Sequence, residues 1–501
     1  MYKPRVFILT DICNEPDDAE SLCRYLVYSN QFHTRGLVAC NSTWMRDAVR
    51  PDAIHEILDA YGKVVDNLNV HVPKDSPYPK VEDLKALVST GPSVYGRKAL
   101  EYDVPLSEGA KMLIDRVDES TTKEPLWVLC WGGTNALAQA LRQVHDIEKR
   151  SEGECKAFRE KLRVYAISDQ DDTGALMRRL YPDIFYIASV HGWNQYGLAA
   201  WTGISGDKFY KFDRGGPDFS KMTPEWIKEN IQIGPLGAVY PDYMFIPEGD
   251  TPTLLYLIQN GLGDPEHPEW GSWGGRYAPS SEGGRNQHYG DVADTVIGQD
   301  GKEHVSNQAT VWRWRDAFQD DFAARMKWTV SERYEQANHA PMVSVNGSGF
   351  SSEVVHITAE AGTRVELDAS ESYDPDSGDK LTFTWTQYKE PTATQWQVAF
   401  EVAPLVITDL SPDPAVPNRK IAVDLPSPGR CCMSPTTRQP VATGQSLHLI
   451  LQVSDDGAPR MTTYKRIVIH CTNTALSDKL GEGERDPMDD FKEAIEKMRR
   501  V

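Results

Sequence analysis

RVFILTDICNEPDD, residues 5–18, is the stretch of sequence that decides the fold. It begins with an apolar run typical of a buried strand, and residues 11–18 then carry four acidic side chains before a helix expected over residues 19–28. The succession of apolar strand, polar turn and amphipathic helix returns at residues 36–61, 126–142 and 162–180. This repetition predicts an α/β domain with an open, mostly parallel sheet and helices on both faces.

The pattern changes at residues 338–341, NHAP, beyond which helical spacing disappears. Val, Thr and Ile then alternate with polar residues between Gly, Pro and Asp turns, which predicts an all-β immunoglobulin-like sandwich. The acidic turn at residues 373–379 could hold calcium, but an Asx-rich turn is the simpler interpretation. We therefore expect an α/β domain over residues 1–337, a β-sandwich over 338–473 and a charged tail with a short helix over 474–501.

Charge and composition exclude some classes of partner. A formal net charge of −20 over 501 residues argues against nucleic acid, whose phosphates are bound by Lys and Arg. No apolar run approaches the roughly 20 residues of a membrane helix, so we expect no membrane span. The start, Met1–Arg5, leads directly into an apolar strand without the features of a secretory signal, which favours the cytoplasm over secretion.

Acidic and polar residues follow the predicted strands. Ligands bind at the carboxyl ends of the strands in an open parallel sheet. The residues at these ends, including those after an apolar run at 243–246, are 11–18, 41–43, 131–135, 168–172 and 247–252. Nine of these residues are Asp or Glu, whose carboxylates would repel one another unless a cation neutralised them. Because calcium prefers such oxygen ligands, the sequence predicts one bound Ca²⁺, with helix capping by Asp17 and Asp18 as the competing explanation.

These residues also resemble a known family. Thr10-Asp11 followed by Asp17–Ala19 resembles the acidic fingerprint of nucleoside hydrolases, and Gly133–Asn135 resembles their Gly-Pro-Leu-Thr-Asn turn. The chain is more similar to the nucleoside-hydrolase-like family known as cellulose-binding, which joins such a domain to a C-terminal immunoglobulin- or polycystic-kidney-disease-like sandwich. That family's pattern N-E-P-D-D-x-x-S-L appears at residues 14–22, and further matches lie at 170–172, 248–252, 260–262, 273–277 and around Asp374.

The resemblance implies roles for five residues. Asp11 would be both a calcium ligand and the base that deprotonates a water molecule on the ion. Asp18 and Asp250 would be further ligands, and Thr134 would bind the ion through its backbone carbonyl. Asp17 would accept a hydrogen bond from a sugar hydroxyl. The reaction implied is a single displacement at an anomeric carbon through an oxocarbenium-like transition state.

Two departures from nucleoside hydrolases change these expectations. Five residues separate Asp11 from Asp17, where those enzymes have three, so the loop follows a different path and brings Asn14 or Glu15 into the site. Their late histidine-aspartate pair is replaced by Glu248-Gly249-Asp250, which puts a nucleobase leaving group in doubt.

The acid for the leaving group is therefore open between His191 and Glu248, and a structural role is the alternative for each. Further candidates come from aromatic-rich stretches, including residues 265–289, which read as neither helix nor strand. The residues expected to contact a sugar are Trp131, Trp193, Asn194, Trp273 and Arg276. Anchoring of the loop to the body of the domain explains the same aromatic residues equally well.

The sequence thus predicts a calcium-dependent hydrolase of a glycosidic or N-glycosidic bond that acts on a carbohydrate or nucleoside-like small molecule. The alternative is a non-catalytic protein that binds a cellulose-like polysaccharide through a hydrolase-derived site. A third interpretation makes the acids a purely structural calcium site. By analogy with similar folds, a homodimer is expected.

Overall fold

The computed structural model describes residues 3–191, 193–280, 288–393, 399–435 and 437–479, together with Glu496. In this part of the chain, no helix is both long enough and apolar enough to span a bilayer. The helix predicted near the end of the charged tail lies outside the described residues.

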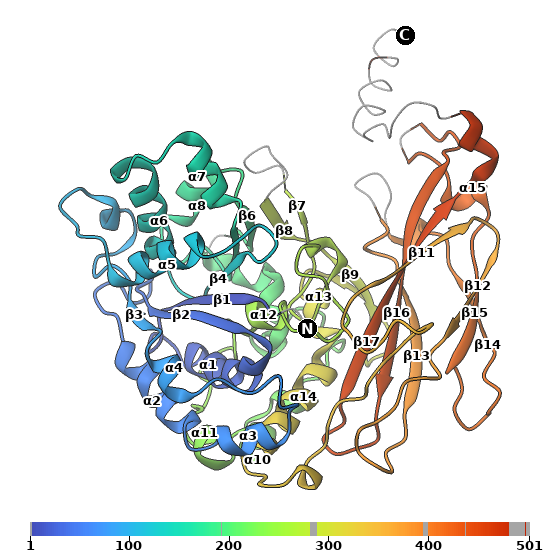
Figure 1. Ribbon diagram of the computed structural model, residues 1–501, viewed down its shortest axis with the longest axis horizontal. Coiled ribbons are helices and arrows are strands. Elements are labelled where there is room, and N and C mark those ends of the chain that lie inside the picture. Colours follow the sequence, from blue (N-terminus) through green and yellow to red (C-terminus); the bar gives the residue numbers. More distant parts are fainter. Residues whose placement is uncertain are drawn as a thin grey trace. The chain divides into compact units, whose positions relative to one another are not determined.

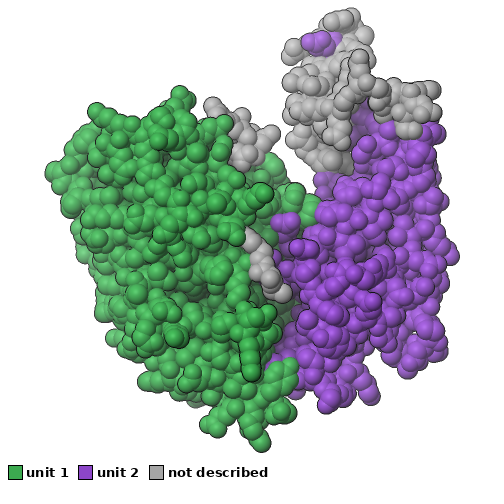
Figure 2. Space-filling view, viewed as in Figure 1, with its two compact units in different colours: residues 1–258, 265–338 green, residues 259–264, 339–501 purple. Residues whose placement is uncertain are grey.

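The chain divides into two compact units, which Figure 2 colours separately. The first comprises Met1–Ile258 and Pro265–Asn338, and the second comprises Gln259–Asp264 and His339–Val501. The boundary expected after residue 337 lies one residue from this division. No sequence pattern predicted that the short segment Gln259–Asp264 belongs to the second unit. The reason is backbone pairing within the second unit, where the Tyr464 N–H donates to the Asn260 carbonyl at 2.9 Å.

The first unit is built on an eight-stranded sheet with the strand order β3-β2-β1-β4-β5-β6-β8-β7 (Figure 1). The neighbouring strands run parallel except for β7 and β8. The strands are β1 (Arg5–Thr10), β2 (His33–Ala39), β3 (Val88–Thr90), β4 (Leu126–Cys130), β5 (Leu162–Ala166), β6 (Phe185–Ala188), β7 (Tyr277–Pro279) and β8 (His288–Asp291). The predicted α/β class with a mostly parallel sheet is confirmed. The strand order reverses between β1 and β4, where such sheets open a crevice for ligands.

Helices cover both faces of this sheet (Figure 1). One core joins Val128 of β4 to Leu113 of α5 and Leu137 of α6, whereas α1 and α12 pack together on the other face. The helices of the unit are α1 (Asp17–Tyr28), α2 (Pro51–Tyr61), α3 (Val65–Val70), α4 (Val81–Lys85), α5 (Glu108–Asp118), α6 (Asn135–Arg142), α7 (Glu152–Arg159), α8 (Gly174–Leu180), α9 (Asp207–Tyr210), α10 (Pro224–Asn230), α11 (Gly234–Gly237), α12 (Thr251–Leu255), α13 (Ala309–Trp312) and α14 (Arg315–Trp328). A short hairpin of β9 (Asp294–Ile297) and β10 (Glu303–Ser306) completes the unit.

Two local predictions were wrong. The apolar run at residues 243–246 is not a strand but a loop, and Met244 and Phe245 in it are exposed. The stretch at 265–289, which looked irregular, supplies β7 and the start of β8. Its strands are only three and four residues long, too short for the alternation that marks a strand in sequence.

The second unit is rich in β-structure. It contains a four-stranded sheet, β11-β17-β16-β13, and a three-stranded sheet, β12-β15-β14, with one hydrophobic core drawn from both. All pairs are antiparallel except β11 with β17. The elements are β11 (Val355–Glu360), β12 (Arg364–Asp368), β13 (Thr382–Tyr388), β14 (Val406–Asp409), β15 (Lys420–Asp424), α15 (Pro428–Cys431), β16 (Thr443–Ser454) and β17 (Thr462–Thr472).

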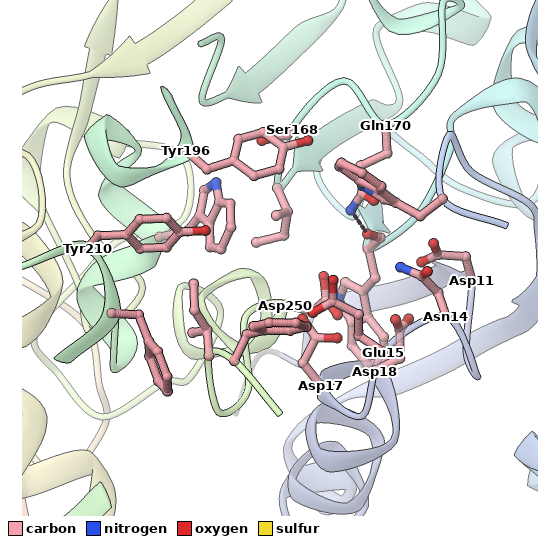
Figure 3. A pocket seen from close by; sticks show the side chains of 17 residues that line it. Asp11, Asn14, Glu15, Asp17, Asp18, Ser168, Gln170, Tyr196, Tyr210 and Asp250 are labelled. Atoms are coloured by element: carbon pink, nitrogen blue, oxygen red, sulfur yellow. Dashed lines mark hydrogen bonds between the residues drawn. The ribbon is translucent and has the colours of Figure 1, made fainter. Parts of the chain in front are cut away.

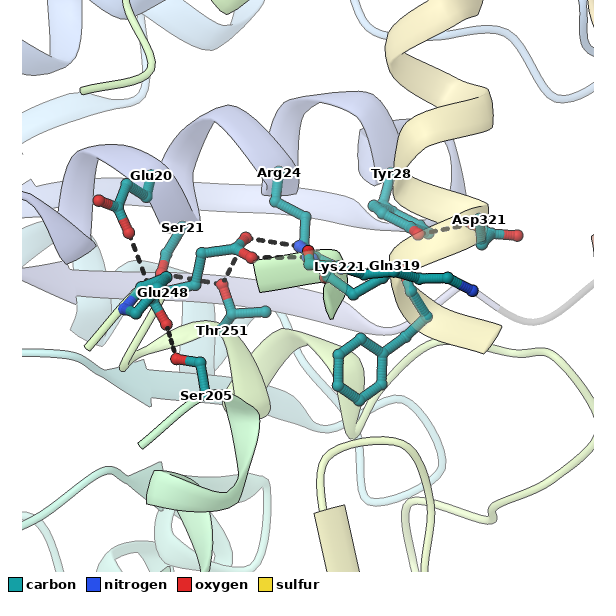
Figure 4. A network of polar contacts seen from close by, with 12 residues as sticks. Glu20, Ser21, Arg24, Tyr28, Ser205, Lys221, Glu248, Thr251, Gln319 and Asp321 are labelled. Carbon is teal, nitrogen blue, oxygen red and sulfur yellow. Dashed lines mark hydrogen bonds and ion pairs between the residues drawn. The ribbon is translucent and has the colours of Figure 1, made fainter. Parts of the chain in front are cut away.

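A buried polar network ties helix α1 to the loop that precedes α12 (Figure 4). Arg24 forms two charged hydrogen bonds to Glu248, from Nε to Oε1 at 2.5 Å and from Nη2 to Oε2 at 2.6 Å. The Glu248 N–H donates to Glu20 Oε2 at 2.6 Å, and the Thr251 and Ser21 hydroxyls pair at 2.9 Å. This network fixes the loop against the helix whose first turn carries Asp17 and Asp18.

The expectation that Glu248 supplies the acid for the leaving group is therefore corrected. Its side chain is 1% exposed, and both of its carboxylate oxygens are bound by Arg24. A carboxylate held in this way by a guanidinium is a structural anchor. Arg24, which is 224 positions away in sequence, was not identified as its partner.

We predict that Arg24→Met lowers the free energy of unfolding by about 3–5 kcal/mol, because it leaves the Glu248 carboxylate buried without a counterion. Urea denaturation followed by circular dichroism measures the change. The double variant Arg24→Met/Glu248→Leu should recover most of the loss, since neither charge of this pair then remains buried without its partner.

The matched control is Arg50→Met, which breaks the exposed ion pair with Asp52 and should leave the free energy of unfolding almost unchanged. Equal effects of the two single variants would show that the buried pair does not anchor the loop.

Candidate functional site

The loops at the carboxyl ends of the central strands surround a cavity of about 330 Å³ (Figure 3). Five acidic and seven aromatic side chains contribute to its lining. In Figure 3 the labelled carboxylates gather on one side, and Tyr196 and Tyr210 lie on the other. Among the described residues that line the cavity, none is Lys or Arg. The cavity is therefore a strongly acidic pocket with an aromatic wall.

Three carboxylates meet in this pocket. Asp17, Asp18 and Asp250 each offer an oxygen, and the three oxygens lie within 4.8 Å of one another. Asp17 and Asp18 begin helix α1, and Asp250 directly precedes α12. Thr10, at the end of β1, donates a hydrogen bond to Asp18. Gly249 leaves room for this group, since a Cβ there would lie 2.6 Å from Asp17 Oδ2 and displace the carboxylate.

The charges of this cluster oppose one another. Burial and then repulsion from neighbouring carboxylates raise the pKa of Asp18 and of Asp250 well above the usual range. Burial, followed by the charges of Glu15 and Asp11, raises the pKa of Asp17 to about 8. Three carboxylates at such distances can all be ionised only beside a cation. Their oxygens are the ligand type that hard divalent cations prefer.

Asp11 lines the same cavity at the end of β1 but stands outside the group of three. It is 1% exposed, and its Oδ2 has no hydrogen-bond partner among the described residues. Burial raises the pKa of Asp11 to about 6. Gly132 allows the end of β4 to approach it, because a Cβ there would come within 2.9 Å of three Asp11 atoms. A buried, unpaired carboxylate oxygen of this kind can accept a proton or bind a cation.

Most of the residues predicted in the first acidic loop do line the cavity. Asn14, Glu15 and Asp17 contribute to it together with Trp131, which follows β4. The Trp131 Nε1–H donates to the Thr253 hydroxyl at 2.8 Å, so the position of the indole is fixed. Burial raises the pKa of Glu15 above its ordinary value.

Two predicted participants lie elsewhere. Thr134 does not line the cavity, and its carbonyl, the expected ligand, accepts the Ala138 N–H at 3.0 Å in helix α6. His191 is also absent from the lining, and its Nε2 lies 2.9 Å from Asp291 Oδ2. Both residues are engaged by the scaffold, so their predicted roles as ligand and acid are corrected.

The predicted contacts of the later loop are corrected in the same way. Trp273 is 1% exposed and packs edge-on against Phe318. The Arg276 Nε–H donates to Asp294 Oδ1 at 2.7 Å. Neither residue lines the cavity, so both anchor the loop to the body of the unit. The side chains of Trp193 and Asn194 lie outside the described part of the structure.

Several cavity residues were not predicted from the sequence. Ser168 and Gln170 belong to the strand end at residues 168–172, which the rule of strand ends identified, but neither was singled out as a site residue. The others come from loops and from short helices after β6 that carry no motif. They are Trp44, Ile167, Tyr196, Trp201, Phe209, Tyr210, Phe245 and Ile246.

Comparison with solved structures supports the fold. A nucleoside hydrolase-related hypothetical protein from Saccharophagus degradans, described as associated with carbohydrate metabolism, is 28% identical, with a TM-score of 0.73, and the match covers 94% of this chain and 100% of that one. The effector protein XOO4466 is 16% identical and the match covers 66% of this chain and 93% of that one, but its TM-score of 0.29 is too low to support an argument. A comparison with curated proteins gives no match.

Family comparison covers both units. Residues 5–277 match the family described as "Cellulose-binding Sde182, nucleoside hydrolase-like domain". Residues 364–471 match the family described as "Cellulose-binding protein Sde0182, C-terminal domain". The first match alone spans more than half of the 501 residues. The chain therefore belongs to the cellulose-binding Sde182 family with a nucleoside hydrolase-like domain.

Proposed function

We propose that this protein is a calcium-dependent hydrolase of a glycosidic or N-glycosidic bond. The observation that carries the proposal is the unpaired, buried Oδ2 of Asp11 in the same cavity as the carboxylates of Asp17, Asp18 and Asp250. A base for water and a set of oxygen ligands are thus present together. The nucleoside hydrolase-like fold supports this kind of chemistry by analogy.

The carboxylates of Asp17, Asp18 and Asp250 would hold the calcium ion, with Asp11 as a further ligand. The donor set fits, because it consists of oxygens and, among the described residues of the cavity, contains no His or Cys. When bound, the ion would lower the pKa of a water molecule and orient sugar hydroxyls. Compared with the sequence prediction, Asp17 takes the place of Thr134.

The chain's own residues would perform the proton transfers. Asp11 accepts a proton from the attacking water, whose oxygen forms the new bond to the anomeric carbon. The bond to the leaving group breaks with its electron pair, and the leaving group takes up one proton. Glu15 is the remaining carboxyl group that lines the cavity, so we assign it as the donor in place of His191 and Glu248. The acidic wall stabilises the positive charge that builds on the sugar.

A second candidate is a carbohydrate-binding protein without turnover. The descriptions of both matching families, which name cellulose binding, favour it. In that case the carboxylates and a cation would hold sugar hydroxyls, and Asp11 would serve only as a ligand. Carbohydrate is the ligand under both candidates, and they differ in whether a bond is broken.

We expect that the wild-type protein with saturating calcium releases reducing sugar from at least one member of a panel of glycosides and nucleosides. Asp11→Asn should lower kcat by at least about 10²-fold, because the amide cannot accept the proton. The assay is release of reducing sugar at calcium concentrations that saturate each variant.

Asp172→Asn is the matched control, since Asp172 is an exposed acid beside the cavity loop after β5 and does not line the cavity. It should keep the wild-type rate. Saturable binding of polysaccharide without any release of sugar would establish the second candidate instead.

A second prediction concerns calcium and stability. Asp250 destabilises the ion-free protein at neutral pH, because its pKa is higher in the folded than in the unfolded state. Asp250→Asn should therefore raise the free energy of unfolding when calcium is absent. With calcium at 100 times its Kd, the wild type should gain about 2.7 kcal/mol, and the variant should lose most of this gain. Thermal unfolding with and without calcium measures this crossover.

The control tests a second cluster of acidic residues, which lies in the other unit. Asp374, Asp376 and Asp379 also bring oxygens within 4.8 Å of one another. Asp374→Asn should leave the calcium-dependent gain of the first unit unchanged. If Asp374→Asn abolished this gain and Asp250→Asn did not, the proposed calcium site would be wrong.

A further inference from the structure

Four large aromatic side chains line the cavity and are also open to solvent. Trp44 is 50% exposed, Phe209 37%, Tyr210 44% and Phe245 55%. We call these four residues the aromatic rim. They come from the loop after β2, from helix α9 and from the loop before Asp250, so no single helix face explains their exposure. Clustered exposed aromatic residues around a cavity indicate a binding surface.

The rim is continuous with the interior of the cavity. The rings of Trp44 and Tyr196 meet edge to face with centroids 6.5 Å apart, and Tyr196 meets Trp201 in the same way at 5.7 Å. Trp201 is only 6% exposed and lies against Gly249, where a Cβ would be 3.5 Å from its ring. An aromatic path therefore leads from the surface to the neighbourhood of the carboxylates.

The two sides of the cavity suit two parts of one ligand. The acidic side, with Asp17, Asp18 and Asp250, suits a sugar unit whose hydroxyls lie near a cation. The rim offers ring faces and few polar groups, which suit the apolar C–H face of a further sugar ring. Because the rim is half exposed, a ligand resting on it can continue into solvent.

We infer that the aromatic rim is a subsite for the second sugar of a glycan chain whose terminal unit occupies the acidic side of the cavity. The inference rests on the proposed function and extends it to the substrate class. The ligand is the end of an oligosaccharide, for which β-1,4-linked glucose is the probe that the family descriptions suggest.

Two other occupants fit the rim less well. A second copy of the chain that covered these four residues would close the cavity that they line. A planar nucleobase would be enclosed best beside buried Trp201, and it would leave the most exposed residues, Trp44 and Phe245, without a role.

The experiment is a calorimetric titration, in the presence of calcium, with methyl β-glucoside, cellobiose, cellotriose and cellotetraose. It is performed on the wild type and on Asp11→Asn, in which turnover does not disturb binding. Affinity should rise roughly tenfold from the single sugar to cellobiose. Trp44→Ala and Phe245→Ala should each remove most of this rise and leave the affinity for methyl β-glucoside unchanged.

Tyr102→Ala is the control, because Tyr102 is an 86% exposed aromatic residue of the same unit that does not line the cavity. It should keep the dependence on chain length. The subsite is rejected if all chain lengths bind equally, or if the rim variants weaken the single sugar as much as the longer ligands. A change of oligomeric state in these variants, measured by light scattering, would assign the rim to a second copy and also reject the subsite.

The two proposals can fail separately. Binding that depends on chain length without release of sugar would reject the hydrolase and keep the subsite. Turnover of single-sugar glycosides without such dependence would reject the subsite and keep the hydrolase.

Discussion

Repulsion among buried carboxylates is the constraint on which the first unit depends. Asp17, Asp18 and Asp250 bring oxygens within 4.8 Å of one another, and their burial raises the pKa of each. A scaffold that holds like charges together must be stabilised elsewhere. Here the buried pair of Arg24 and Glu248 fastens the loop of Asp250 to the helix of Asp17 and Asp18. Helix α1 thus carries two of the repelling carboxylates in its first turn. About two turns later it carries Arg24, whose guanidinium holds the loop of Asp250 in place.

Much of the fold and the acidic half of the site could be predicted from the sequence. The strand β4 is a fully apolar run, and β1 is apolar between Arg5 and Thr10, as expected of parallel strands covered on both faces. The rule that ligands bind at strand ends then predicted that Asp11 and Asp18 lie at the same edge of the sheet. Asp250 was identified for a partly mistaken reason, because the run at residues 243–246 that precedes it is a loop and not a strand. The likeness of its motif to a known family compensated for that error.

The rest of the site depends on contacts that no local pattern records. Glu248 looked like a catalytic acid because its partner Arg24 lies 224 positions away. Trp273 was predicted to contact a sugar, but its ring is buried against Phe318. The short irregular stretch around it gives no sequence pattern that indicates this burial. Conversely, Tyr196 and Trp201 lie in short 3₁₀ helices. These helices are too short for a sequence pattern to indicate which of their side chains face a cavity.

A comparison with two other buried carboxylates supports the inference that the negative charge of the cavity binds a ligand. Asp294, which is fully buried, is bound by both Arg276 and Arg313, and Glu248 is bound by Arg24. These two buried carboxylates outside the cavity are thus neutralised by guanidinium groups of the chain itself. At the cavity it provides none among the described lining residues, although Asp250 stands only two positions from Glu248. The counter-charge of this cluster must therefore come from a cation outside the chain or be replaced by bound protons, and the raised pKa values show that burial and repulsion favour the protons when no cation is bound.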